Sequence, residues 1–209
     1  MPRKPSAVER TQHESRQSTD SGARYEFLRA LDLALRPGAE RRRVEILRLL
    51  RQASKKGDSR AQYALGSWYA HGIGVRRNHR MAYRLFLEAA KQGHPLAQYN
   101  AAVGLETGRG VRKSPASAFK WYEAAARNGD ADAQIEVGRC YFYGIGAKRN
   151  HEKAVSWYRR AARRGNRDAQ HALGYCYDTG LGVKKNPSRA HAWYSKAQNK
   201  SRFPRRPVA

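Results

Sequence analysis

Apolar positions along this chain follow the spacing of amphipathic helices, and the same pattern returns every 36 residues. In residues 130–165, for example, Ala133, Val137 and Tyr141 are spaced i, i+4 and i+8, which predicts a helix with one buried face. A Gly-x-Gly segment follows, and then a second apolar stretch that ends at another glycine. Because glycine tolerates positive φ at turns and helix ends, each copy predicts a first helix (helix A), a turn, a second helix (helix B) and a turn.

Four copies align without a gap, over residues 58–93, 94–129, 130–165 and 166–201. All four contain an Ala-Gln pair at the start of helix A, the Gly-x-Gly segment after it, and an alanine in helix B; three also contain a Trp-Tyr pair, which is Leu-Phe in the first copy. One such helix pair cannot bury its apolar face alone, so successive copies are expected to stack. The sequence therefore predicts an all-α fold, a right-handed α-solenoid of 36-residue helix-turn-helix repeats.

The ends of the chain depart from this pattern. Residues 22–57 form a fifth, degenerate copy, in which Gly57 stands 36 residues before Gly93 but the Ala-Gln pair is lost; we interpret it as a capping repeat. Its first half keeps helical spacing at four apolar residues, Tyr25, Leu28, Leu31 and Leu35. Residues 1–21 are predicted to be a disordered basic or polar leader, and residues 202–209 a basic tail in which two prolines stop a helix.

Local signals inside the copies predict where helices begin and how closely they pack. Each helix B is expected to start after an Asn or Ser cap, namely Asn78, Ser114, Asn150 and Asn186. A small residue in each helix A is expected to let its neighbour approach closely, namely Gly66, Ala102, Gly138 and Gly174. The recurrent Trp-Tyr pairs are interpreted as core between repeats, with Trp157 buried, rather than as a surface for stacking nucleic-acid bases.

At this point the sequence resembles the Sel-one-like repeats, a branch of the tetratricopeptide superfamily. The third copy matches the pattern of that family at twelve positions: Ala133, Val137, Gly138, Tyr141, Gly144, Gly146, Ala154, Trp157, Tyr158, Ala161, Ala162 and Gly165. The resemblance covers residues 58–201 strongly and 22–57 weakly. It implies an adaptor or scaffold for protein complexes. Since the shared pattern is structural, the resemblance transfers no catalytic residue.

Composition points to partners rather than to chemistry. The chain has 42 Lys and Arg against 17 Asp and Glu, a net charge of +25, which favours acidic or polyanionic partners. No apolar stretch is long enough for a transmembrane helix, and the first residues lack the apolar region of a secretory signal, so a cytoplasmic protein is expected. Cys140 and Cys176 occupy the same repeat position and are expected to be buried thiols.

Motifs for catalysis and metal binding are missing from the sequence. No HExxH, GxSxG or P-loop pattern occurs, and no CxxC or Cys/His cluster suggests zinc. We therefore expect no catalytic residue, no cofactor and no metal site, and a protein that is not an enzyme.

Two sets of residues remain as candidates for binding. Positions of helix A that differ between copies line one stripe, a candidate site for a protein or peptide on the concave side of the solenoid. This helix-A stripe comprises Tyr63, Ser67, His71, Tyr99, Val103, Thr107, Ile135, Arg139, Tyr143, His171, Tyr175 and Thr179. The alternative is that these positions are merely solvated and drift freely.

A dibasic pair follows each Gly-x-Gly and is expected to form a ladder that binds anions. The pairs are Arg76-Arg77, Arg112-Lys113, Lys148-Arg149 and Lys184-Lys185. The leading hypothesis is a non-catalytic protein-interaction scaffold with a partner that is acidic; the alternative is a protein associated with nucleic acid or another polyanion through the dibasic ladder. The alternative for the charges is that they serve only solubility. The sequence leaves the oligomeric state open.

Overall fold

The computed structural model describes residues 7–198, with side chains from residue 21 onward, and divides the chain into two compact units. The first unit ends at His94 and the second begins at Pro95. The basic tail predicted at 202–209 lies outside the described residues, as does the end of the fourth copy.

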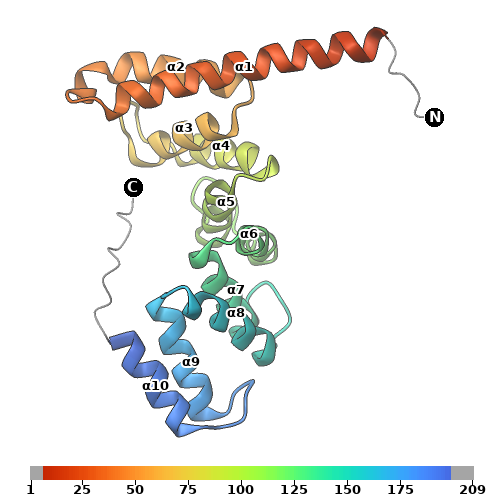
Figure 1. The fold of residues 1–209 in the computed structure, drawn as a ribbon, viewed down its shortest axis with the longest axis vertical. Helices are drawn as coiled ribbons and strands as arrows, with labels where there is room; N and C mark the ends of the chain where they lie inside the picture. Colours follow the sequence, from red (N-terminus) through yellow and green to blue (C-terminus); the bar gives the residue numbers. More distant parts are fainter. Residues whose placement is uncertain (1–6, 199–209) are drawn as a thin grey trace. The chain divides into compact units, whose positions relative to one another are not determined.

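In the first unit, two helical hairpins pack in sequence order, with α2 against both α1 and α3 and α3 against α4 (Figure 1). The elements are α1 (Ala7–Leu35), the short 3-10 helix η1 (Ala39–Arg42), α2 (Arg43–Lys55), α3 (Ser59–His71) and α4 (His79–Lys91).

The second unit repeats the same hairpin three times, and each helix B packs on the next helix A. Its helices are α5 (Pro95–Thr107), α6 (Pro115–Arg127), α7 (Ala131–Tyr143), α8 (His151–Arg163), α9 (Arg167–Thr179) and α10 (Pro187–Gln198). Helices A of the four copies are therefore α3, α5, α7 and α9, and helices B are α4, α6, α8 and α10. The all-helical, repeating architecture confirms the predicted α-solenoid class.

The predicted caps form at the starts of helices B. The side-chain oxygens of Asn78, Asn150 and Asn186 accept hydrogen bonds from backbone amides three residues later, at 3.0, 2.9 and 2.9 Å. Ser114 accepts one from Ser117 at 3.4 Å and is followed by Pro115 at the first helical position, where a missing amide hydrogen costs nothing. These bonds fix where each loop ends.

Each Gly-x-Gly loop ends one helix A, and the loops of the third and fourth copies also reach the preceding repeat. The first glycine, such as Gly144 at φ 76°, ends the helix in the left-handed region. The second glycine lies against backbone: a Cβ on Gly146 would overlap the Pro115 carbonyl, and one on Gly182 would overlap the His151 carbonyl. In these two copies the loop therefore rests on the first residue of the previous helix B, a backbone approach that only glycine permits.

The first hairpin differs from expectation along α1. This helix begins at Ala7, so residues 7–20 are helical where a disordered leader was predicted; no proline occurs between Pro5 and Pro37 to interrupt a helix. The four apolar residues with helical spacing on this helix are exposed, with Leu35 at 78%, whereas the small Ala23 and Ala30 are buried. Ala30 belongs to the core of this hairpin, and the larger Phe27 and Leu33 are partly buried against it.

The reading of residues 22–57 as a degenerate repeat is favoured by register. Helix α2 begins at Arg43, 36 residues before α4 begins at His79, and the side chain of Arg43 lies within 4 Å of the position of a Cβ on Gly74. The start of α2 thus lies beside the loop of the first copy, just as the starts of α6 and α8 lie beside the loops of the third and fourth copies.

A buried glutamine at the start of helix A joins that helix to the end of the previous hairpin. The side-chain amides of Gln62, Gln134 and Gln170 donate to the carbonyls of Ser54, Ala126 and Ala162, at 3.5, 3.3 and 3.2 Å. This contact explains the recurrent Ala-Gln pair: the alanine packs with no exposed surface. The glutamine adds a side-chain donor to a carbonyl in the last turn of the previous helix, which also accepts the backbone amide of the glycine three residues later.

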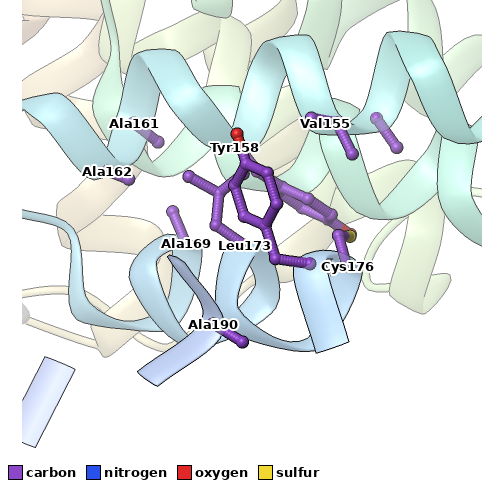
Figure 2. Packing of buried hydrophobic residues seen from close by; sticks show 10 residues of the cluster. Val155, Tyr158, Ala161, Ala162, Ala169, Leu173, Cys176 and Ala190 are labelled. Carbon is purple, nitrogen blue, oxygen red and sulfur yellow. The ribbon is translucent and has the colours of Figure 1, made fainter. Parts of the chain in front are cut away.

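Within a repeat, helix A and helix B meet where a glycine lies against an aromatic ring. A Cβ on Gly66 would be 2.8 Å from Phe86, one on Gly174 would be 2.6 Å from Tyr194, and one on Gly138 would overlap the ring of Tyr158. Tyr158 is 4% exposed and packs among Leu173, Cys176 and neighbouring alanines (Figure 2).

The prediction that Trp157 is buried in the core was wrong. The second residue of the pair, Tyr158, is buried, whereas Trp157 is half-buried, with the guanidinium of Arg160 4.6 Å from its ring centre. The two residues are adjacent on a helix and differ by about 100° in direction, so only one can point at helix A.

The two cysteines are confirmed as free, buried thiols. Burial raises the pKa of both Cys140 and Cys176 to about 11. Both thiols therefore stay protonated at neutral pH and act as small apolar groups.

The glycine–ring contact can be tested by whether an alanine at the glycine position destabilises or stabilises the protein. Alanine is the better helix former by about 1 kcal/mol, yet Gly138→Ala is expected to lower the free energy of unfolding by about 1–3 kcal/mol, because its methyl group would overlap Tyr158. The measurement is chemical denaturation followed by circular dichroism. In a Tyr158→Leu background the same substitution should cost less; a stabilising Gly138→Ala would contradict the contact.

The corrected roles of the aromatic pair give a second test. Tyr158→Ala should lower the free energy of unfolding by about 3–5 kcal/mol, because it leaves a cavity against Leu173. Trp157→Ala removes a half-buried ring and a cation–π contact and should cost about 1 kcal/mol. Thermal melts of the two variants would show this difference. Equal losses of stability would mean that Trp157 belongs to the core after all.

Candidate protein-binding face

In the first unit, the helix-A stripe consists of three residues on α3 that contact their own repeat. The ring of Tyr63 stacks on His94, with centroids 4.8 Å apart, and is 5.8 Å from the ring of Phe86. His71 Nδ1 lies 2.9 Å from the carbonyl of Ser67. All three residues are half-buried or exposed, and they lie on the single helix α3.

In the second unit, the stripe extends over α5, α7 and α9, whose side chains contact one another. On α5, the Tyr99 ring lies 5.6 Å from Tyr122, Val103 is half-buried, and the Thr107 hydroxyl donates to the Val103 carbonyl at 2.8 Å. Thr179 donates in the same way to Tyr175 on α9. Both threonine hydroxyl groups are therefore engaged within their own helices.

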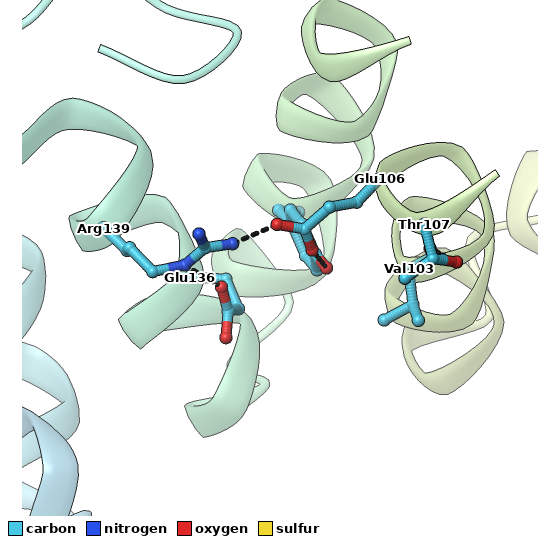
Figure 3. A network of polar contacts seen from close by, with 6 residues as sticks. Val103, Glu106, Thr107, Glu136 and Arg139 are labelled. Atoms are coloured by element: carbon cyan, nitrogen blue, oxygen red, sulfur yellow. Dashed lines mark hydrogen bonds and ion pairs between the residues drawn. The ribbon is translucent and has the colours of Figure 1, made fainter. Parts of the chain in front are cut away.

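Arg139 is a stripe residue whose guanidinium is occupied inside the protein. It forms ion pairs with Glu136 on its own helix, at 2.7 Å, and with Glu106 on α5 (Figure 3). Glu106 also accepts a hydrogen bond from the Tyr122 hydroxyl at 2.7 Å, and this bond together with Arg139 lowers the pKa of Glu106 against the opposing effect of burial. This network joins α5 to α7.

Carboxylates surround the neighbouring Tyr99. Burial, followed by the charges of Glu136, Asp132, Asp130 and Glu106, raises the pKa of Tyr99 to about 12. The surroundings of this part of the face are therefore negative, although the whole chain is strongly positive.

Three stripe residues come together around a pocket of about 290 Å³ in the second unit. Tyr143 comes from the end of α7, and His171 and Tyr175 from α9; Tyr143 and Tyr175 are 65% and 46% exposed. Phe142 forms the centre, since its ring lies 5.0 Å from Tyr143, 6.3 Å from Tyr158 and 6.2 Å from Tyr175. We call this cavity the aromatic pocket.

Besides Ala172, sequence reasoning missed three residues of the aromatic pocket that carry a ring or a charge: Phe142, Tyr158 and Asp168. Tyr158 was assigned to packing alone. The other two had a signal in the sequence, because position 142 reads Ala, Glu, Phe and Asp across the four copies, and position 168 reads Arg, Leu, Asp and Asp. Variable positions beside the chosen stripe therefore also belong to the face.

The dibasic residues are exposed in all four loops. Among the residues that the structure describes, none of the eight forms an ion pair. The second member of each pair lies over the first glycine of its loop: a Cβ on Gly144 would be 3.4 Å from Arg149 Cβ, and one on Gly180 would be 3.4 Å from Lys185 Cβ. The first members have no such packing role.

The repeated hairpins define an α-solenoid repeat protein, a class whose stacked helices present extended binding surfaces. Residues 59–94, 95–130, 131–166 and 167–198 match the Sel1 repeat. Each match begins one residue later than the copy predicted from sequence, and the last ends at 198 rather than 201. The chain belongs to the Sel1 repeat family, which confirms the resemblance, and proteins of this family are generally non-catalytic scaffolds for protein–protein interaction.

Two solved structures are similar to this chain. The crystal structure of c5321, a protective antigen present in uropathogenic Escherichia coli strains, displays an SLR fold; it is 32% identical with a TM-score of 0.80, and the match covers 88% of this chain and 40% of that one. A Sel1 repeat protein from Oxalobacter formigenes is 34% identical with a TM-score of 0.75, over 82% of this chain and 69% of that one. This chain thus spans less than half the length of the antigen. No curated protein matches it.

Within the described residues, none of the helices has both the length and the apolar character needed to cross a membrane. In that same part of the chain, no three His, Cys, Asp or Glu side chains gather in a way that would hold a metal ion.

Proposed function

We propose that this protein is a non-catalytic scaffold that binds a partner protein or peptide on the helix-A face of its repeats, and that it acts in the cytoplasm, where its two free thiols stay reduced. The observation that carries the proposal is the aromatic pocket, where two exposed tyrosines border a cavity on helices A. The recurrent glycines, alanines and capping residues serve the loops, the core and the helix starts, whereas Tyr143 and Tyr175 vary between copies and are exposed. Tyrosine is enriched in protein interfaces because it offers a large apolar ring together with a polar hydroxyl.

Capture of a partner by the full chain tests this proposal. We expect the Tyr143→Ser/Tyr175→Ser variant to lose the partner captured by the wild-type chain from nuclease-treated lysate, measured by quantitative mass spectrometry. Tyr25→Ser is the matched control, since Tyr25 on α1 is 65% exposed, as is Tyr143. The variant should melt as the wild type does. If it and the control retain the same partners, the helix-A face is not the binding surface.

A second candidate function concerns the dibasic loops. Their eight exposed charges without ion pairs favour attraction of a polyanion, either an acidic protein surface or a nucleic-acid backbone. In the second unit, the stacking of successive loops on the preceding helices B supports a regular series of such charges along one edge.

The first members of the pairs allow a clean test, since they have no packing role. Replacing Arg76, Arg112, Lys148 and Lys184 with Gln should weaken binding to nonspecific DNA and RNA in a gel shift and make its salt dependence shallower. The matched control replaces four exposed basic residues of helices B, Arg80, Lys91, Lys120 and Arg163, and thus removes the same charge. Equal losses in the two variants would mean that only net charge matters, and no loss would assign the loops to solubility.

A further inference from the structure

We infer that the aromatic pocket receives an arginine side chain from a basic, extended segment of the partner. The inference rests on the proposed function and specifies the chemistry of that same face. It reverses the expectation that the net charge of the chain creates, because the charge is not evenly distributed over the second unit.

Helices A of the second unit carry most of its acidic residues. The acidic residues on α5, α7 and α9 are Glu106, Asp132, Glu136, Asp168 and Asp178, and the basic ones are Arg139 and Arg167. The remaining described residues of this unit, in helices B and loops, include sixteen basic residues against three acidic ones. The face that holds the aromatic pocket therefore differs in sign from the rest of the unit.

Both basic residues of these helices are occupied by internal acceptors. Arg139 is bonded to Glu106 and Glu136, a group of three charges whose sum is −1. Arg167 Nε donates to the Ala197 carbonyl at 2.8 Å, at the end of α10. The guanidinium groups of both residues thus have fixed acceptors, and the exposed Asp168 is the acidic residue among those that line the aromatic pocket.

The lining of the aromatic pocket suits a guanidinium in particular. Ring faces attract cations, arginine more often than lysine, and the planar guanidinium can also pair with a carboxylate through two parallel hydrogen bonds. The rings of the lining belong to Phe142, Tyr143, Tyr158, His171 and Tyr175, and its acidic residue is Asp168. An acidic side chain would instead meet Asp168 and the faces of electron-rich rings, which is unfavourable.

The positive charge elsewhere does not prevent this binding at physiological salt. The Debye length is about 8 Å there, so the charges that line the aromatic pocket act on a ligand more strongly than exposed charges on distant loops. At very low salt, repulsion of a basic peptide by the whole chain extends further. The affinity for an arginine peptide, relative to an uncharged peptide, is therefore expected to be higher at physiological salt than at very low salt.

The test uses the full chain and three fluorescein-labelled peptides, GSRSGRSG and its counterparts with citrulline or glutamate in place of both arginines. Citrulline keeps the shape of arginine and removes its charge. In fluorescence anisotropy at physiological salt, the arginine peptide should bind at least about tenfold more tightly than the citrulline peptide. Asp168→Asn and Tyr175→Ala should each weaken the arginine peptide several-fold, whereas Asp178→Asn, an exposed acid on the same helix that does not line the pocket, should leave it unchanged.

The contrary outcomes are distinct. Equal binding of the arginine and citrulline peptides, wild-type binding by Asp168→Asn, or tightest binding of the glutamate peptide would overturn the arginine assignment. If the Arg205→Gln/Arg206→Gln variant bound the arginine peptide tenfold more tightly, the basic tail of the chain itself would be competing for the pocket. That result would overturn the assignment of the pocket to a partner. If the captured partner needs Tyr175 but not Asp168, the scaffold function stands and only the arginine assignment is wrong.

Discussion

The close approach of helix A to helix B, where a glycine lies against an aromatic ring in three of the four copies, is the constraint on which the other packing depends. With Gly138 in contact with Tyr158, the ring is placed between α7, α8 and α9 and reaches both the core and the floor of the aromatic pocket. The second copy shows the same position with a methyl group: Ala102 replaces the glycine, and Tyr122 bonds Glu106 through its hydroxyl. One contact therefore links packing to the chemistry of the face.

Most of the fold could be predicted from the sequence because the repeat supplies the same evidence several times. Caps, glycine turns and the period of 36 residues are local signals, and the structure places them as expected. The core role of the Trp-Tyr pair was assigned to the wrong member, Trp157. Two adjacent residues of a helix point in different directions, and the sequence pattern does not show which of two apolar neighbours points at helix A. On α1, the apolar residues that keep helical spacing are exposed, and the core is instead formed by Ala30, with Phe27 and Leu33 partly buried against it.

The candidate site could be predicted only in part. Variation between copies identified Tyr143, His171 and Tyr175, which lie together around one cavity. It could not show that Arg139 is held by two glutamates, because Glu106 lies 33 residues away and its partner is fixed only by how α5 and α7 pack. Nor could the net charge of the chain show that acids concentrate on helices A, since a sum over residues contains no direction.

The packing of the Gly-x-Gly loops of the third and fourth copies on the start of the previous helix B has a consequence for how such a chain can change in length. A residue inserted between Gly144 and Asn150 would displace either the glycine that touches Pro115 or the cap that starts α8. A whole additional copy of 36 residues would instead bring its own loop, cap and contact surface. Lengthening by complete duplications is therefore compatible with this architecture, whereas single insertions in the loops are not.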